Sequence, residues 1–176
     1  MHRLIAHPAA LPRRVKGVQV RLRHFSNGDL FLRWRIDGAQ DVCLPEESLK
    51  VRGDDLWHTT CFEMFLDCAN GAYREFNFSP SGQWAAYEFS DYRKRVGNTE
   101  IRHDLTVEVQ RGETIIAGAV RVPAHALKDG RAASLCAVIE ESGDHKSYWS
   151  NLHGKDHPDF HDPACHVLDF AAPRVS

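Results

Sequence analysis

The residues best suited to contact a ligand lie in one block, residues 54–89, which begins DDLWHTTCFEMFLD and ends YREFNFSPSGQWAAYEF. It combines an aromatic side chain, Trp57, with an acidic one, Glu63, and an amide, Asn77. Sugar rings pack their apolar C–H faces on aromatic planes, and their hydroxyls need charged or amide partners that offset desolvation. Trp57 precedes a strand-like segment, in a loop, where ligand contacts are common. The block predicts a small-ligand site; the competing interpretation is that Trp57 plugs one edge of the fold.

Two acidic side chains of this block, Glu63 and Glu75, form a candidate carboxyl pair. Paired carboxyl groups that face each other across a site are the acid and base of glycoside hydrolases. Opposite charges on neighbouring strands are also ordinary sheet stabilisation. The arginines available for such pairing are Arg21, Arg23, Arg33, Arg35 and Arg74. We therefore predict ion pairing for these glutamates and no enzymatic activity.

The run NLHGKDHPDFHDPACH, residues 151–166, concentrates side chains of the types that bind metals. They are His153, His157, His161, His166, Asp156, Asp159, Asp162 and Cys165. The spacing matches neither HExxH nor a zinc finger, and two prolines exclude a helix that would align three histidines. Haem is disfavoured because the only methionines are Met1 and Met64, and Met64 is expected in the core. A polar loop without metal or other cofactor is predicted.

Strands must position these residues, and apolar and polar residues alternate with a period of two along most of the chain. VQVRLRHF (18–25) and LFLRWRID (30–37) flank an Asn-Gly turn, the strongest short-range signal of a hairpin. The other expected strands span residues 60–67, 73–80, 83–90, 105–112, 114–123, 134–141 and 166–170. Only residues 123–128 suggest a short helical turn.

This pattern predicts an all-β fold, a two-sheet antiparallel β-sandwich of jelly-roll type with about nine or ten strands. The chain shows no repeat and no linker, so residues 1–176 are predicted to form a single domain. Alternation places Phe62 and Met64 in the core, with Glu63 and Phe65 on the opposite face.

Charge and composition exclude several classes of partner. The formal net charge of −2 argues against the broad basic surface that nucleic acid or an anionic membrane requires. The five cysteines include no CxxC pair, so neither a zinc ribbon nor a disulfide framework is indicated. The N-terminal MHRLIAHPAALPRRVK lacks the apolar stretch of a secretory signal, and we therefore expect a cytoplasmic protein.

Block 54–89 also resembles DOMON-like domains and, more distantly, the family 9 carbohydrate-binding modules. The shared pattern is a Trp shortly before a strand reading apolar-Glu-apolar-Phe-apolar-Asp, then a strand with an aromatic residue and Asn, then a turn with Gly. The matching positions are Trp57, Phe62-Glu63-Met64-Phe65-Leu66-Asp67, Phe76-Asn77 and Gly82. The tail, YWSN (148–151) followed by DFHDPACHVLDF (159–170), is similar to the end of such a module.

The resemblance implies a β-sandwich in which two aromatic rings hold a sugar ring while a Glu and neighbouring polar groups bond its hydroxyls. Carried over to this sequence, the two rings are Trp57 and Phe160. Glu63 and Asn77 become the polar contacts, and Trp149 supports the wall of the site.

His161 adjoins Phe160 in the same loop and completes the predicted ligand-binding residues. We therefore expect a non-catalytic module for a small, carbohydrate-like ligand. The alternative is a protein-interaction domain with no small ligand. A ligand site requires a pocket that exposes Trp57 and Phe160 close together, whereas an interaction domain requires a flat apolar patch.

Overall fold

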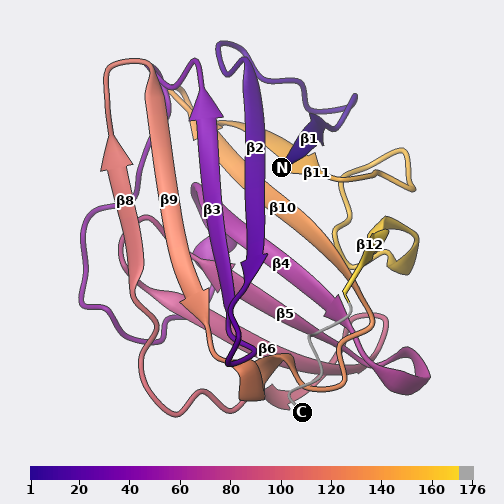
Figure 1. Ribbon diagram of the computed structural model, residues 1–176. Coiled ribbons are helices and arrows are strands. Elements are labelled where there is room, and N and C mark those ends of the chain that lie inside the picture. The colour runs from indigo at the N-terminus through magenta and orange to yellow at the C-terminus, as the bar shows by residue number, and fades with distance from the viewer. Residues whose placement is uncertain (171–176) are drawn as a thin grey trace.

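The computed structural model describes residues 1–170, and its strand pairs are antiparallel (Figure 1). The strands are β1 (His2–Ala6), β2 (Gly17–His24), β3 (Leu30–Asp37), β4 (Cys61–Asp67), β5 (Tyr73–Phe78), β6 (Trp84–Asp91), β7 (Lys94–Asn98), β8 (Val107–Arg111), β9 (Ile115–Val122), β10 (Ala132–Glu141), β11 (His145–Ser150) and β12 (Leu168–Asp169). The all-β prediction is confirmed. The last residues of the predicted domain, 171–176, lie outside the described residues.

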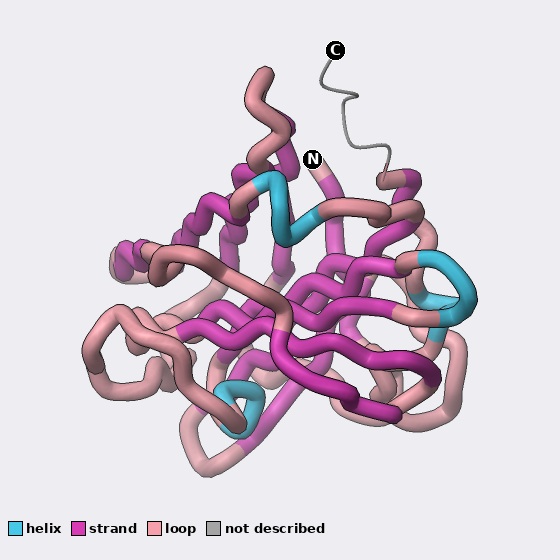
Figure 2. The backbone as a smooth tube through the Cα atoms, turned by 90° about the horizontal axis from the view of Figure 1, so that it is seen from below, coloured by secondary structure: helices cyan, strands magenta, loops and turns pink. Residues whose placement is uncertain are grey.

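Helical structure within residues 1–170 is limited to four short 3₁₀ turns, which Figure 2 shows among the loops at the ends of the strands. They are η1 (Leu56–His58), η2 (Ala69–Gly71), η3 (Ala124–Leu127) and η4 (Pro163–Cys165). The predicted helical turn within 123–128 is confirmed as η3. None of these turns has the length and apolar character that crossing a membrane requires.

The strands form one continuous sheet, which corrects the prediction of two separate sheets. The order is β7-β6-β5-β4-β10-β11-β1-β2-β3-β9-β8, and β12 pairs with β10. β1 joins the two parts because it pairs with β2 through His2–Leu4 and with β11 through Ile5 and Ala6. Nine or ten strands is also too low a number, because the described residues form twelve. The pattern misses β1, β7 and β11, which are short and lack a clean apolar alternation.

The sheet folds over so that its two parts pack face to face, as the layers of a sandwich do. We call them the β3 half (β2, β3, β8, β9) and the β4 half (β4–β7, β10, β11); in Figure 1 their strands cross at an angle. Between them, the rings of Trp34 and Phe62 stack with centroids 5.1 Å apart. Gly118 makes this contact possible, because a Cβ there would lie 2.7 Å from the Phe62 ring. Phe62 and Met64 are fully buried, as alternation predicts.

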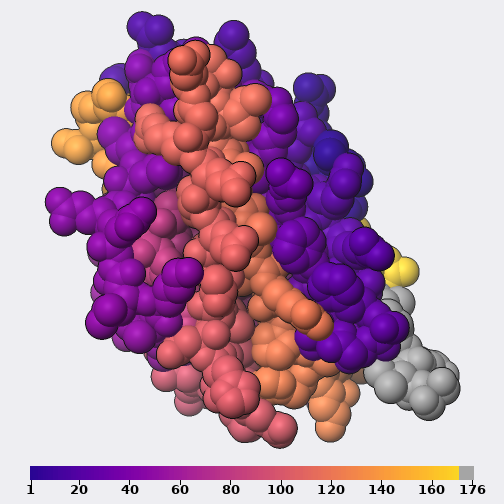
Figure 3. All heavy atoms as spheres, turned by 60° about the vertical axis from the view of Figure 1, so that its left-hand side comes forward, coloured from indigo at the N-terminus to yellow at the C-terminus, as the bar shows by residue number. Residues whose placement is uncertain are grey.

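The edge strands of the sheet are β7 and β8, and the two edges differ in what surrounds them. Figure 3 brings the β8 side of the molecule forward. There the Arg111 side chain donates hydrogen bonds to the backbone oxygens of Val42, Gln40 and Ala39 at 2.8, 3.2 and 3.4 Å. At the other end, β7 carries exposed charged side chains, and its pairing with β6 shifts register twice.

A buried carboxylate at the end of β10 fixes the segment that leads into β2. Glu141 is buried and accepts hydrogen bonds from the backbone N–H groups of Arg14, Arg13 and Val15 at 2.6, 2.8 and 3.2 Å. An amide nitrogen cannot accept these bonds, so we expect Glu141→Gln to lower the free energy of unfolding by about 1–2 kcal/mol. Urea denaturation measures the change. Glu140→Gln is the matched control, and equal stability of the two variants would contradict this role.

Candidate ligand-binding site

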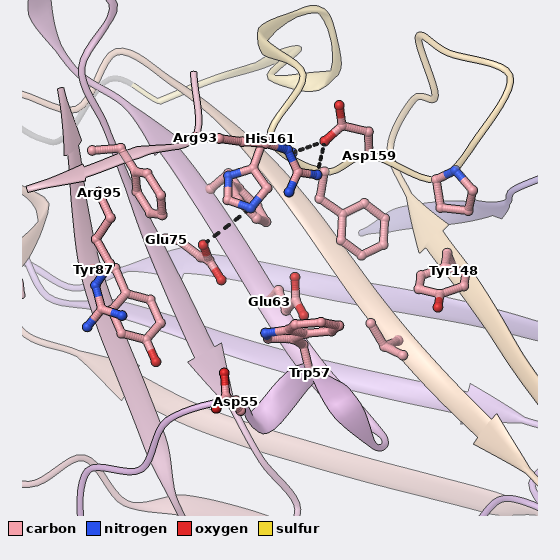
Figure 4. A pocket seen from close by; sticks show the side chains of 15 residues that line it. Asp55, Trp57, Glu63, Glu75, Tyr87, Arg93, Arg95, Tyr148, Asp159 and His161 are labelled. Atoms are coloured by element: carbon pink, nitrogen blue, oxygen red, sulfur yellow. Dashed lines mark hydrogen bonds and ion pairs between the residues drawn. The ribbon is translucent and has the colours of Figure 1, made fainter. Parts of the chain in front are cut away.

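A cavity of about 470 Å³ lies on the face of the β4 half that points away from the core (Figure 4). Its floor consists of residues that alternate with core residues along three neighbouring strands: Glu63 and Phe65 in β4, Glu75 in β5, and Tyr87 and Phe89 in β6. Its walls come from the loop around η1, the β6–β7 hairpin and the loop between β11 and β12. The cavity therefore joins a rigid sheet to three connecting segments.

Two aromatic side chains from segments far apart in the sequence reach this cavity. Trp57 in η1 is 46% exposed, whereas Phe160 in the loop before β12 is only 8% exposed. The Phe160 ring packs edge-on against Phe65 and Tyr148, with centroids 6.3 and 6.1 Å apart. The structure thus brings the loop before β4 and the loop before β12 together, and Trp57 supplies the more open ring.

Three polar side chains are buried in the floor. Asn77 Nδ2 donates a hydrogen bond of 2.7 Å to Glu75 Oε1. Glu63 Oε1 and Asn77 Oδ1 are buried and have no hydrogen-bond partner among the described residues. Burial, reinforced by the charge of Glu75, raises the pKa of Glu63 well above its usual value. Burial also raises the pKa of Glu75, against the opposing effects of the Asn77 amide and of two nearby arginines.

Among the residues that the structure describes, Glu63 and Glu75 form no ion pair with any of the five arginines named as candidate partners. The prediction of ion pairing with these arginines is therefore wrong. Arg74 alternates with Glu75, so it points to the opposite face of β5, where it lies 3.5 Å from Glu88. The other four candidate arginines are on β2 and β3, in the β3 half. Glu63 and Glu75 share one face of the sheet, and the arginines that line the cavity on this face are Arg93 and Arg95.

Asp159 anchors the loop between β11 and β12 to the β6–β7 hairpin. Its buried carboxylate accepts hydrogen bonds from Tyr92 Oη (2.6 Å), Lys155 Nζ (2.6 Å), Arg93 Nη2 (2.8 Å) and the backbone N–H of His161 (3.2 Å). Burial alone raises the pKa of Asp159, but the hydrogen bonds from Lys155, Tyr92 and Arg93 outweigh it and lower the pKa. Asp159 is therefore an ionised, fully bonded group that fixes one wall of the cavity.

His161 connects this wall to the floor. Burial, and then the charge of Arg93, lowers the pKa of His161 to about 4, so its imidazole is neutral near pH 7. The Tyr73 hydroxyl lies 2.8 Å from His161 Nδ1 and accepts a hydrogen bond from the backbone N–H of Arg93 at 3.0 Å. His161 Nε2 lies 3.7 Å from Glu75 Oε2, so the imidazole bridges the Tyr73 hydroxyl and the floor carboxyl group.

The histidines of residues 151–166 do not converge on one point. His166 is buried, bonds the carboxylate of Asp67 and lies with Nε2 3.2 Å from the backbone oxygen of Phe160. His153 Nε2 lies 2.9 Å from the backbone oxygen of Ile5. Within residues 1–170, no three His, Cys, Asp or Glu side chains are grouped as metal ligands would be. The two anchored histidines hold the loop in place, and His166 helps to present Phe160.

Trp149 does not line the cavity, which corrects its predicted role. Side chains alternate along β11, so Trp149 packs into the core, where its Nε1 donates a hydrogen bond of 2.9 Å to Ser147 Oγ. The neighbouring Tyr148 points the other way and lines the cavity. Asn77 is also not a lining residue, since it is fully buried and bonds Glu75. The cavity does include the other four predicted residues, Trp57, Glu63, Phe160 and His161.

Several cavity residues are absent from the predicted set. Tyr87 lies directly opposite Glu75 across the β5–β6 pair, and the register of that predicted hairpin could have identified it. Arg93 and Arg95 belong to the turn before β7 and to β7 itself, a segment without a strand-like pattern. The Arg95 guanidinium stacks on the Tyr87 ring, 3.9 Å from its centroid. No short-range signal indicates these two arginines.

No family model matches this chain, and neither does any curated protein. Among solved structures, it is similar to a "putative carbohydrate-binding protein from Bacteroides uniformis ATCC 8492", with a TM-score of 0.68, 15% identity and coverage of 97% of this chain and 85% of that one. Two structures of a family 9 carbohydrate-binding module from Caldicellulosiruptor kristjanssonii, in complex with cellotriose and with glucose, give a TM-score of 0.48 and 9% identity over 85% of this chain and 73% and 74% of theirs.

The likeness to the Bacteroides uniformis protein shows a shared fold. The resemblance to DOMON-like domains stays a prediction.

Proposed function

We propose that this protein is a small-ligand binding module that holds a carbohydrate-like ligand in the cavity and does not transform it. The observation that carries the proposal is that the half-exposed Trp57 ring and the buried carboxyl group of Glu63 line the same cavity (Figure 4). The indole supplies an apolar plane for the C–H face of a sugar ring, and the carboxyl groups of the floor supply hydrogen bonds for its hydroxyls. The cavity volume of about 470 Å³ lies within the roughly 300–1,000 Å³ of small-molecule sites.

The remaining cavity residues receive roles that follow from their positions. Tyr148 and Phe160 close the side of the cavity with apolar surface and one hydroxyl. Arg93 and Arg95 place hydrogen-bond donors on the side of the β6–β7 hairpin, across from Trp57. Asn77 acts on the ligand only through Glu75, which it orients by their hydrogen bond.

Two further points favour a small ligand over a protein partner. A protein-interaction surface without a small ligand calls for a flat apolar patch, whereas this face is hollowed and carries buried carboxyl groups. The fold is also shared with a structure described as a "putative carbohydrate-binding protein". Both points support a small ligand in the cavity.

Isothermal titration with a panel of sugars tests the proposal, with Trp fluorescence as a second readout. The panel contains glucose, N-acetylglucosamine, glucosamine, glucuronate and cellobiose. We expect saturable binding at one site per chain for at least one sugar, with recovery of that sugar unchanged after long incubation. If no sugar of the panel bound saturably, the proposal of a carbohydrate-like ligand would be contradicted. Release of reducing ends from cellobiose by the wild type, lost in Glu63→Gln, would contradict the non-catalytic assignment.

A further inference from the structure

Two buried oxygens in the floor of the cavity lack a partner, and they belong to side chains that face each other. Glu63 in β4 and Asn77 in β5 are direct partners across the strand pair, so their side chains lie on the same face. Glu63 Oε1 and Asn77 Oδ1 are both without a hydrogen bond among the described residues. Both atoms are acceptors unless the carboxyl group carries a proton.

The other neighbours on this face cannot supply the missing donor to Asn77. They are Ala85 across the β5–β6 pair, Glu75 in β5, and Ser79 directly after β5. Ala85 has no polar side-chain atom, and Glu75 already accepts from Asn77 Nδ2. Ser79 Oγ accepts hydrogen bonds from Ser81 Oγ at 2.9 Å and from the Ser81 backbone N–H at 3.2 Å, and it makes no hydrogen bond with Asn77 Oδ1. Of the neighbours of Asn77 on this face, Glu63 is then the one that could donate to the amide oxygen, provided that its carboxyl group carries a proton.

The neighbours of Glu63 also point to Asn77 as its hydrogen-bond partner. Its cross-strand neighbours on this face are Asn77 in β5 and Cys136 in β10, and its neighbours along β4 are Cys61 and Phe65. The Cys136 thiol is engaged with Ser134 and Ser150, each 3.3 Å away.

We propose that Glu63 is a neutral carboxylic acid near pH 7, with its proton on Oε1 donated to Asn77 Oδ1. Glu75 is then the ionised member, accepting from Asn77 Nδ2. One proton satisfies both orphaned oxygens, and the amide sets the order because it can donate to one carboxyl group while it accepts from the other.

The charges around the two carboxyl groups favour a protonated Glu63 and an ionised Glu75 over the opposite distribution of the proton. Arg93 and Arg95 both lower the pKa of Glu75, and the Nε2 side of His161 faces it at 3.7 Å. The pKa of Glu63 is instead raised by burial and then by the Glu75 charge. The titratable and charged groups that face the pair across the cavity and within the floor are Asp55, Tyr87, Arg93, Arg95, Tyr148, Asp159, His161, Cys61 and Cys136.

With Glu63 protonated and Glu75 ionised, the floor of the cavity selects the chemistry of the ligand group that contacts it. This inference rests on the proposed function. With its proton committed to Asn77, Glu63 offers the ligand only its second oxygen, an acceptor, and Glu75 offers only acceptors. The ligand must therefore present hydrogen-bond donors here, as the hydroxyls of an uncharged sugar do. A carboxylate or phosphate group would face unpaired acceptors and be excluded from this end of the cavity.

Carbon-13 NMR of protein labelled at the glutamate carboxyl carbons tests the proton directly, without any ligand. Glu63→Gln and Glu75→Gln each remove one signal and so assign the pair. We expect the Glu63 signal at the position of a protonated acid at pH 7 and the Glu75 signal at that of a carboxylate. The reverse assignment, or two ionised groups at pH 7, would overturn the proposal.

Stability against pH gives an independent readout. A carboxyl group whose folded pKa is raised stabilises the fold fully below its usual value of 4.5, and this contribution is lost as the pH rises toward the folded pKa. Glu63→Gln has no such loss, so its folding constant should rise relative to the wild type above pH 4.5, by up to about tenfold per pH unit. Glu108→Gln, at an exposed position of β8, is the control and should show no such rise. If the difference in stability between Glu63→Gln and the wild type did not change with pH, a protonated Glu63 would be contradicted.

The donor requirement is tested separately with deoxyfluoro analogues of whichever panel sugar binds. Fluorine replaces one hydroxyl donor at a time, and we expect at least one position to weaken binding tenfold or more. Equal affinity across the series would overturn the donor requirement while leaving the proposed binding function intact. If no parent sugar bound, the proposed function would be contradicted. The NMR experiment would still determine whether Glu63 is protonated at pH 7.

Discussion

Replacing Asp159 by Ala is expected to lower the free energy of unfolding by about 2–4 kcal/mol and to abolish sugar binding. The carboxylate is 1% exposed and receives three charged or hydroxyl donors and one backbone N–H. Removing one member of such a buried network leaves the other polar groups without partners. The effect stays below the largest known cases because the Arg93 and Lys155 side chains are partly exposed and can be rehydrated.

The loss of binding follows because Asp159 connects two walls of the cavity. Without it, the β6–β7 hairpin and the loop that carries Phe160 and His161 lose their shared anchor. Urea denaturation and sugar titration measure the two effects. Asp156→Ala is the matched control, an exposed aspartate of the same loop. Stability and affinity equal to those of Asp156→Ala would show that the network contributes nothing.

Replacing Trp57 by Ala is expected to weaken sugar binding by at least 30-fold, about 2 kcal/mol, while changing stability by less than about 0.5 kcal/mol. The indole is half exposed, so its removal leaves no buried cavity in the core, but it deprives the ligand of its main apolar plane. Titration with the best sugar of the panel gives the affinity, and urea denaturation gives the stability.

Trp57→Phe is the companion variant, because it keeps an aromatic plane at the same position. We expect it to recover part of the lost affinity. A large loss of stability in Trp57→Ala would favour the interpretation of Trp57 as a plug at the edge of the fold. Unchanged affinity would remove Trp57 from the site altogether.

The fold was predictable where local pattern and local pairing agree. The β2–β3 hairpin follows from an Asn-Gly turn between two alternating segments, and β4 presents Phe62 to the core and Glu63 to the other face as alternation requires. β11, with the sequence HKSYWS, lacks such a pattern and forms because β10 and β1 flank it. The continuity of the sheet was not predictable, because it depends on β1 pairing with two strands far apart in the sequence.

The site was predictable in part for the same reason. Trp57 and Glu63 stand beside a strong strand pattern, which fixes the direction of their side chains. Trp149 was carried over from the resemblance, and β11 was not recognised as a strand whose alternation turns Tyr148, and not Trp149, toward the cavity. Arg93 and Asp159 meet only through contacts between two loops, and no pattern within either segment encodes that meeting.

The two ends of the sheet bear on whether copies of this chain aggregate. An edge strand with free N–H and C=O groups is a template for another strand, and natural sheets protect such edges with charges, bulges or covering segments. Here β7 combines exposed Lys94 and Arg95 with an irregular register, and Arg111 ties residues 39–42 across the β8 end. A second chain that added a strand at either end would have to bury those charges or displace that segment. Both ends of the sheet are thereby protected against the addition of another strand.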